Sequence, residues 1–336
     1  MKEAMLYEGL DGSVRCGLCP HRCTIADGGR GLCGVRENRG GTLYSLVYGK
    51  PVAAHADPIE KKPLFHFMPG TRAYSISTVG CNLSCEHCQN HEISQSPREG
   101  RNVLGGEKTA EEVVSDAAGS GCASIAYTYT EPTVYMEYAV EIAEKAVAEG
   151  LKNVFVSNGY MTAEAREAII PYLHADNIDL KSFSDRFYRE LCGGSLEPVL
   201  ETLKAMVKAG VWVEVTTLII PGQNDGADEL RQIADFISGE LGGFVPWHVS
   251  RFHPDYKMIG TPPTGVDILE RAVAIGRDSG LKYVYAGNLP HGDYENTYCP
   301  GCGELVVERV GFNVVSNKLG EGICPSCKAE LEGVWK

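Results

Sequence analysis

The sequence predicts an α/β protein whose central part is a partial (β/α) barrel, similar in layout to a TIM barrel. Three features support this prediction. Strand-like and helix-like segments alternate from about residue 71, a cysteine-rich, glycine-rich segment precedes them, and two CxxC motifs follow them near the end of the chain. We therefore expect a cysteine-rich metal-binding module over residues 1–70, a barrel core over 71–290 and a zinc-ribbon-like module over 291–336.

The N-terminal module is expected to be irregular and to fold around a metal. Cys16, Cys19, Cys23 and Cys33 lie close together in the sequence, beside Pro20 and several glycines. Such a segment offers little hydrophobic core, so metal binding would supply much of its folding free energy. Four thiolates suit either zinc or a second [4Fe–4S] cluster, and the residue types leave both open.

The core is predicted from runs rich in β-branched or aromatic residues, which are typical of strands. The strand candidates are residues 74–79, 124–130, 153–157, 177–180, 211–220, 246–250 and 283–286. Between them, residues 135–147 carry apolar side chains at intervals of three and four, and Thr109 with Glu112 forms a capping box at the start of another helix. Repeated strand–helix units predict a parallel sheet with right-handed crossovers.

The C-terminal module contains Cys299, Cys302, Cys324 and Cys327 in the pattern C-x2-C-x21-C-x2-C. The segment between the two motifs reads as a short hairpin. Four thiolates suit a closed tetrahedral zinc site, and a small iron–sulfur cluster is the alternative.

The composition restricts the possible partners and the compartment. The net charge of −13 disfavours a nucleic acid or an anionic membrane surface as a partner. No apolar run is long enough to span a bilayer, and the N-terminus lacks the features of a signal peptide, so a cytoplasmic location is expected. Thiols stay reduced there, and the 13 cysteines therefore predict metal sites rather than disulfides.

A third cysteine group, Cys81, Cys85 and Cys88, follows the first core strand in the pattern C-x3-C-x2-C. A [4Fe–4S] cluster normally takes four thiolates, so three would leave one iron open to an external ligand. The alternative is zinc with His87 or His91 as the fourth ligand. The remaining cysteines, Cys122 and Cys192, are interpreted as small buried hydrophobic residues.

Polar side chains stand at the ends of the other predicted strands. In barrels of this kind the chemistry lies at the C-terminal ends of the strands, so these residues are expected to converge on the cysteine group. They are Thr130, Glu131, Ser157, Asn158, Asp179, Lys181, Thr216, Thr217 and His248.

The cysteine segment GCNLSCEHCQN resembles the motif of the radical SAM superfamily. TYTEPT (128–133) resembles the family's Gly-Gly-Glu segment, while SNG (157–159) and DLKS (179–182) resemble segments of the pyruvate formate-lyase activating-enzyme branch. The sequences CGLCPHRCTIADGGRGLCGVREN, TTLIIPGQND, PWHVSRFHPDYKM and NTYCPGCG resemble the radical SAM member of the AmmeMemoRadiSam system, and this resemblance extends over nearly the whole chain.

The resemblance implies a radical SAM oxidoreductase. A [4Fe–4S] cluster held by Cys81, Cys85 and Cys88 would reductively cleave S-adenosylmethionine (SAM) to methionine and a 5′-deoxyadenosyl radical. That radical would abstract hydrogen from a substrate which the sequence does not identify. Glu131, helped by Thr130, would then hold the SAM ammonium group.

The resemblance also assigns roles to other strand-end residues. His87 would pack on the adenine, Ser157, Asn158 and Asp179 would line the SAM pocket, and His248 would contact ribose or substrate. Lys181 would either steer a carboxylate or stabilise an oxyanion, or it would pair with Asp179 or Glu131. The activating-enzyme branch uses a carboxylate for a monovalent cation where this chain has Val156.

Several functions and partners therefore remain open. The substrate is either a small molecule or a protein, and one specific alternative is an activase of a glycyl radical enzyme. A different class is a non-catalytic, zinc-binding interaction protein. Expected partners are a reduced flavodoxin- or ferredoxin-type electron donor and, through the AmmeMemoRadiSam resemblance, Memo-like and AMMECR-like proteins.

Overall fold

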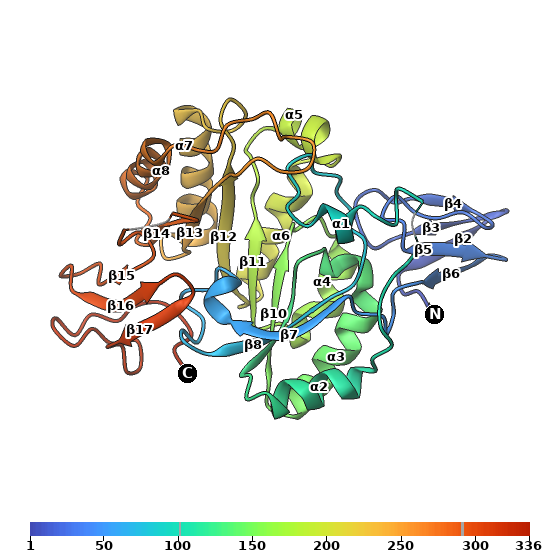
Figure 1. Ribbon diagram of the computed structural model, residues 1–336, viewed down its shortest axis with the longest axis horizontal. Coiled ribbons are helices and arrows are strands. Elements are labelled where there is room, and N and C mark those ends of the chain that lie inside the picture. The colour runs from blue at the N-terminus through green and yellow to red at the C-terminus, as the bar shows by residue number, and fades with distance from the viewer. Residues whose placement is uncertain (101, 290–291) are drawn as a thin grey trace.

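The computed structural model describes residues 1–100, 102–289 and 292–336, and its centre is one eight-stranded sheet (Figure 1). The strand order is β14-β13-β12-β11-β10-β9-β8-β7. Strands β8 (Arg72–Ser77) to β14 (Val284–Gly287) run parallel, whereas β7 (Ala53–Pro58) is antiparallel to β8. Within the described residues β7 and β14 pair on one side only, so the sheet is a partial barrel.

All seven predicted core strands are confirmed. Those between β8 and β14 are β9 (Ser124–Tyr127), β10 (Lys152–Ser157), β11 (Ala175–Asp179), β12 (Trp212–Ile219) and β13 (Trp247–Arg251). Most of their side chains are buried, as is usual for the strands of a parallel sheet.

Helices connect these strands and lie along one side of the sheet (Figure 1). They are α1 (His91–Ser94), α2 (Ala110–Gly119), α3 (Met136–Ala148), α4 (Ala163–Ile169), α5 (Asp185–Phe187), α6 (Glu197–Lys208), α7 (Ala227–Phe236) and α8 (Val266–Asp278). The 3-10 segments are η1 (Ile59–Lys61), η2 (Pro132–Tyr135) and η3 (Ile170–Tyr172), and the π-helical segments are η4 (Tyr188–Cys192) and η5 (Ile237–Gly242). The predicted capping box of Thr109 and Glu112 is present at the start of α2.

The N-terminal module is more regular than the sequence predicts. It forms two three-stranded sheets, β1-β6-β5 and β2-β3-β4. The strands are β1 (Lys2–Glu3), β2 (Tyr7–Leu10), β3 (Ser13–Cys16), β4 (Thr24–Ala26), β5 (Arg36–Arg39) and β6 (Thr42–Ser45). The expectation of an irregular segment was wrong, because strands of two to four residues are too short to show a clear alternation of apolar and polar residues.

The C-terminal module contains the expected hairpin, β16 (Leu305–Val310) with β17 (Asn313–Asn317), and β15 (Thr297–Tyr298) pairs with β16. The buried Arg309 donates to the Phe65 carbonyl oxygen at 2.8 Å and so joins the ribbon to the core. The predicted boundary between residues 290 and 291 lies outside the described residues.

Among the helices of the described chain, none has the length and apolar character needed to cross a membrane.

Candidate active site

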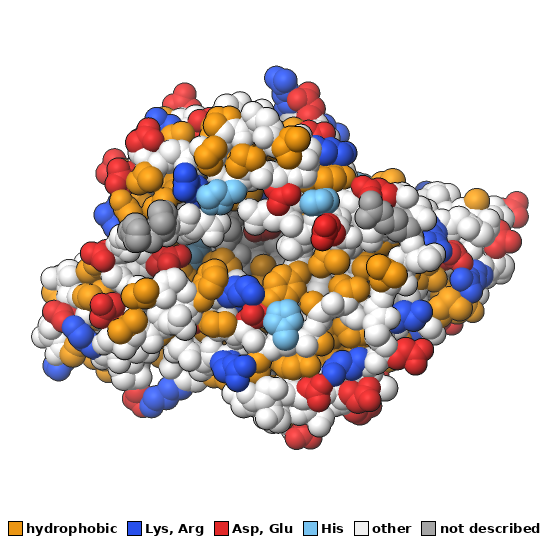
Figure 2. All heavy atoms as spheres, viewed as in Figure 1, with side chains coloured by type: hydrophobic (Ala, Val, Ile, Leu, Met, Phe, Trp, Pro, Cys, Tyr) orange, Lys and Arg blue, Asp and Glu red, His pale blue; other side chains and the backbone are white. Residues whose placement is uncertain are grey.

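A pocket of about 300 Å³ lies at the C-terminal ends of the parallel strands. The space-filling view shows this face of the molecule hollowed near its centre, with charged and histidine side chains around the hollow (Figure 2). The following predicted site residues line the pocket: Cys81, Cys85, His87, Cys88, Thr130, Glu131, Ser157, Asn158, Asp179, Lys181 and Thr216. Strand ends far apart in the sequence therefore meet here, as the barrel prediction requires.

The three cysteines of the pocket lie in the loop after β8, with Cys85 buried and Cys81 and Cys88 half-buried. Among the described residues, the three sulfurs are not all within 4.8 Å of one another. Thiolates that bind one zinc ion at about 2.3 Å must lie closer together than that, at about 3.8 Å. Thiolates on a cubane bind different irons and do not need to lie so close, so the three cysteines lack the spacing of a single-ion zinc site.

Cys192 was expected from the sequence to be a small buried hydrophobic residue. It lies beside the loop after β8 that carries Cys81, Cys85 and Cys88, here called the cluster loop. Its sulfur, the Cys85 sulfur and a His87 ring nitrogen all lie within 4.8 Å of one another. The sequence could not predict this contact, because Cys192 ends η4 more than a hundred residues after Cys85 and the two meet only in the fold. His91, the other zinc-ligand candidate, instead stacks on Tyr256 at 4.5 Å.

His87 is buried on the pocket wall, and no hydrogen bond is made to its Nδ1 atom by any described residue. Burial, reinforced by the positive charge of Lys181, lowers the pKa of His87 to about 3. The ring is therefore a neutral aromatic surface at physiological pH.

Glu131 is at the centre of a hydrogen-bond network that joins β9 to β10. Its Oε1 atom accepts from the Thr133 amide and hydroxyl and from the Ser157 hydroxyl, at 3.0, 2.6 and 2.9 Å. Its Oε2 atom accepts from the Asn158 amide at 2.8 Å. A carboxylate has about four acceptor positions, and Oε1 is fully used. Oε2 keeps one position for a further donor in the pocket.

Thr130 and Asn158 connect this network to the cluster loop. The Thr130 hydroxyl donates to the Thr78 carbonyl oxygen at 2.8 Å, and its backbone amide donates to the Thr128 carbonyl oxygen at 2.8 Å. The side-chain Nδ2 of Asn158 donates to Asn82 Oδ1 at 2.8 Å and lies 3.7 Å from the Cys81 sulfur. These contacts fix the position of the loop that carries the first cysteine.

Lys181 forms the predicted ion pair with Asp179, at 2.8 Å. Burial alone would lower the pKa of Lys181. The negative charge of Asp179 and of the nearby Cys85 and Cys192 thiols outweighs burial and holds the pKa well above its usual value. The site therefore keeps a permanent positive charge beside the cysteine loop.

His248 lies outside this pocket, in a smaller neighbouring cavity with Phe65 and Tyr285. Its Nε2 atom lies 2.6 Å from Glu214, whose carboxylate also accepts the amides of Phe65 and His66. This buried pairing explains why the residue is not among the pocket-lining side chains.

A charged group at the pocket mouth was missed by the sequence analysis. Tyr129 has a left-handed backbone with φ of 66°, rare for a tyrosine, and its hydroxyl donates to Asp57. Lys61 and Lys62 each lie 2.9 Å from the same carboxylate. Tyr129 and Lys61 line the pocket. The adjacent lysines were visible in the sequence, but their partner Tyr129 could be found only from the fold.

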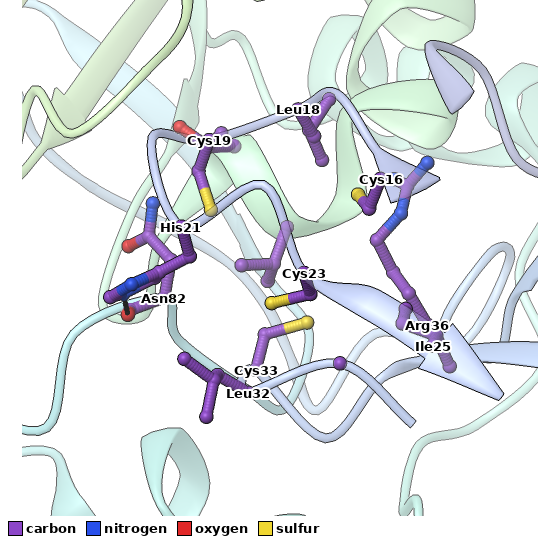
Figure 3. A pocket seen from close by; sticks show the side chains of 13 residues that line it. Cys16, Leu18, Cys19, His21, Cys23, Ile25, Leu32, Cys33, Arg36 and Asn82 are labelled. Carbon is purple, nitrogen blue, oxygen red and sulfur yellow. Dashed lines mark hydrogen bonds between the residues drawn. The ribbon is translucent and has the colours of Figure 1, made fainter. Parts of the chain in front are cut away.

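The two outer cysteine groups differ in spacing. The ligand atoms of Cys299, Cys302, Cys324 and Cys327 all lie within 4.8 Å of one another, as in a site for a single metal ion. Cys16, Cys19, Cys23 and Cys33 instead surround a pocket in the N-terminal module (Figure 3).

Comparison with known proteins gives a family for the core. A model of the radical SAM superfamily matches residues 75–237. The chain is 49% identical over 335 residues to an uncharacterized protein from Methanocaldococcus jannaschii, covering 99% of each chain. It is 24% identical over 210 residues to a pyruvate formate-lyase-activating enzyme from Clostridium pasteurianum, covering 56% of this chain and 83% of that protein.

Solved structures agree on the fold. Streptococcus suis SuiB bound to S-adenosylmethionine superposes with a TM-score of 0.50 and 13% sequence identity, covering 68% of this chain and 53% of that chain. At this identity the likeness concerns the arrangement of strands and helices.

Proposed function

The chain belongs to the radical SAM superfamily, and we propose that its strand-end pocket binds a [4Fe–4S] cluster through Cys81, Cys85 and Cys88, with SAM as the ligand of the open iron. The observation that carries this proposal is that three free thiols of one loop line a polar pocket at the strand ends. When bound, the cluster supplies the one electron that cleaves SAM to methionine and a 5′-deoxyadenosyl radical.

The chain's own residues would bind and orient SAM. The remaining acceptor position on Glu131 Oε2 suits the ammonium group, and the preceding residue, Thr130, lines the same pocket. His87 offers a neutral ring for the adenine, with an unpartnered Nδ1. Ser157 and Asn158 hold the Glu131 carboxylate in place, and we assign Asp179 to the same pocket wall.

Lys181 is assigned an electrostatic role. Its ammonium group is paired with Asp179 and lies in the field of the Cys85 thiol. It would offset the negative charge of the thiolates and attract an anionic group on SAM or substrate. We assign His248 to support of the pocket floor through Glu214 rather than to direct contact with ribose.

The substrate class has two candidates. Homology to activating enzymes favours a glycine of a glycyl radical enzyme, from which the 5′-deoxyadenosyl radical would take a backbone hydrogen. The sequence resemblance to the AmmeMemoRadiSam enzyme instead favours another substrate, handled with Memo-like and AMMECR-like partners. Either requires a one-electron donor of the flavodoxin or ferredoxin type. A zinc ion is assigned to the ribbon cysteines, whose tight spacing suits one metal ion.

Product analysis tests the proposal. The anaerobically reconstituted protein, given SAM and dithionite, is expected to release 5′-deoxyadenosine, and Cys85→Ala is expected to release none. Cys122→Ala is the matched control, because this buried cysteine lies at the start of β9, away from the pocket. Equal release by wild type and Cys85→Ala would contradict the assignment. A glycyl radical signal in an added pyruvate formate-lyase-type protein would select the activase alternative.

A further inference from the structure

Four cysteines of the N-terminal module surround one pocket, and the proposed catalysis does not use them. Cys16 ends β3, Cys19 and Cys23 lie in the loop before β4, and Cys33 lies in the loop before β5. Figure 3 shows the side chains of Cys19, Cys23 and Cys33 directed toward the space between these loops. The rest of the lining is partly apolar and partly polar, with Arg36 and Asn82 among the polar residues, and Leu32 is 56% exposed. One side of this pocket is therefore close to solvent.

The spacing of these sulfurs separates two kinds of metal site within the same molecule. In the C-terminal ribbon all four cysteines lie mutually within 4.8 Å, which suits one zinc ion. Among the described residues of the N-terminal module, no three cysteine sulfurs all lie within 4.8 Å of one another. The sulfurs of Cys81, Cys85 and Cys88 do not either. The N-terminal group therefore lacks the close spacing of the single-ion site in the ribbon, and a cubane, whose thiolates bind separate irons, does not need that spacing.

A buried cation independently indicates negative charge in this pocket. Arg36 is 1% exposed and lines the pocket beside Cys16 and Cys33. Its Nη1 atom lies 2.8 Å from Glu137, yet its Nε atom has no hydrogen-bond partner among the described residues. A buried guanidinium is costly unless opposite charge surrounds it, and one carboxylate leaves part of it unpaired. Thiolates holding a metal cluster would supply the missing negative charge.

The N-terminal pocket and the active site share a wall, residues 80–82. Gly80 has a left-handed φ of 101°, and a Cβ atom built on it would lie 3.1 Å from the Cys33 carbonyl oxygen. Cys81 lines the active site, while its neighbour Asn82 lines the N-terminal pocket. The His21 Nε2 atom also lies 2.8 Å from the Asn82 carbonyl oxygen. Two consecutive residues of one loop therefore line the two pockets. Their Cα atoms are about 3.8 Å apart, so only this loop separates the pockets at that point.

We propose that Cys16, Cys19, Cys23 and Cys33 bind a second [4Fe–4S] cluster, which passes electrons to the catalytic cluster. The second part rests on the proposed function. An external donor of the flavodoxin or ferredoxin class would lose one electron, which takes the second cluster from the 2+ to the 1+ state. Transfer across the shared wall would then return it to 2+ and reduce the catalytic cluster by the same electron. No bond forms or breaks in this step.

Metal analysis of the reconstituted full chain tests the binding site. The wild type is expected to contain about eight irons and one zinc per chain. About four irons and two zincs would overturn the proposal without the need for any variant. The double variant Cys16→Ser/Cys19→Ser is expected to keep about four irons and its zinc. The matched variant Cys302→Ser/Cys327→Ser, in the ribbon, is expected to lose only zinc.

The relay is tested by comparing two reductants in the Cys16→Ser/Cys19→Ser variant. The ratio of 5′-deoxyadenosine released with reduced flavodoxin to that released with dithionite is expected to fall by about ten-fold or more relative to wild type. Unchanged release with flavodoxin, or equal loss with both reductants, would overturn the relay. If the wild type contains about eight irons but cleaves no SAM, the proposed function is contradicted, whereas the binding of a second cluster is supported.

Discussion

The Asn158 amide donates to the Glu131 carboxylate at 2.8 Å, so that two residues from separate strand ends meet inside the pocket. The sequence predicts both as SAM-binding residues, and the structure adds that they bind each other. Through its side chain Asn158 also reaches Asn82 in the cluster loop. The Glu131 carboxylate therefore lines the pocket and, through Asn158, also connects the ends of β9 and β10 to the cluster loop.

Glu131→Gln is expected to weaken SAM binding by about ten-fold or more, because it removes charge-assisted hydrogen bonds of about 1.5–3 kcal/mol and turns one acceptor into a donor. Iron content should stay at the wild-type value, since no cysteine is altered. Anaerobic titration calorimetry with SAM and iron analysis measure both quantities. Glu144→Gln, at an exposed position of α3, is the matched control. If Glu131→Gln binds SAM with wild-type affinity, the carboxylate only positions the neighbouring loops and does not bind SAM.

Most of the core could be predicted from the sequence, because each parallel strand is a buried apolar run with a clear turn or helix after it. The edge strand β7 could not. Its sequence AAHADP contains no β-branched residue, and its extended form depends on pairing with β8. The same limit applies to the site. Glu131 and Lys181 stand at strand ends and were predictable, whereas Cys192 reaches Cys85 only through the fold.

His248 illustrates a second limit. As a strand-end histidine it satisfies the sequence pattern for a pocket residue. The structure pairs it with Glu214, thirty-four residues earlier, on the neighbouring strand β12. A buried carboxylate that also accepts two backbone amides determines where the imidazole lies. No spacing rule in a single sequence reports such a pair.

Lys181→Met is expected to make the catalytic cluster harder to reduce. The substitution removes a buried positive charge near the Cys85 thiol but keeps an apolar stem of similar length. The reduction potential should fall by an amount on the order of tens of millivolts, because a less positive surrounding disfavours the added electron. A redox titration followed by electron paramagnetic resonance measures the shift. Lys152→Met, at the start of β10 and the opposite end of the sheet, should leave the potential unchanged.

An unchanged potential in Lys181→Met would mean that Asp179 already cancels the lysine charge at the cluster. The variant Asp179→Asn then discriminates between the two cases. It leaves Lys181 unpaired and is expected to raise the potential, because the 2.8 Å ion pair is the main screen of that charge.

Tyr129→Phe is expected to lower the free energy of unfolding by about 1 kcal/mol, because the buried Asp57 loses a half-buried hydroxyl donor. The aromatic ring remains, so the contact with the Lys62 ammonium, 4.6 Å from the ring centre, is kept. Denaturant unfolding monitored by circular dichroism measures the change. Tyr298→Phe, at an exposed ribbon position, is the control. A loss no larger than that of the control would mean that Lys61, Lys62 and Ser75 alone satisfy Asp57.

His66 is expected to make stability fall as the pH falls below about 6.5, the ordinary histidine pKa. The ring is fully buried. Its Nδ1 atom lies 2.8 Å from the Glu332 carbonyl oxygen, so Nδ1 carries the proton and Nε2 accepts from the Tyr285 hydroxyl at 2.6 Å. Burial lowers the pKa of His66 to about 4, and although Glu214 opposes this shift, Arg309 and His248 add to it. The folded chain therefore keeps the ring neutral where the unfolded chain protonates it.

The sign of the pH effect follows from proton counting. Between about pH 6.5 and pH 4 the unfolded state binds more protons at this site, so the free energy of unfolding decreases as pH decreases. The contribution lost between pH 7 and pH 5 is about 2 kcal/mol. Denaturant midpoints of the anaerobic holoprotein measure it. His66→Gln should show a flatter profile than wild type by this amount, whereas His253→Gln, at an exposed position, should follow wild type. Parallel profiles for wild type and His66→Gln would mean that the buried ring is already protonated in the folded state.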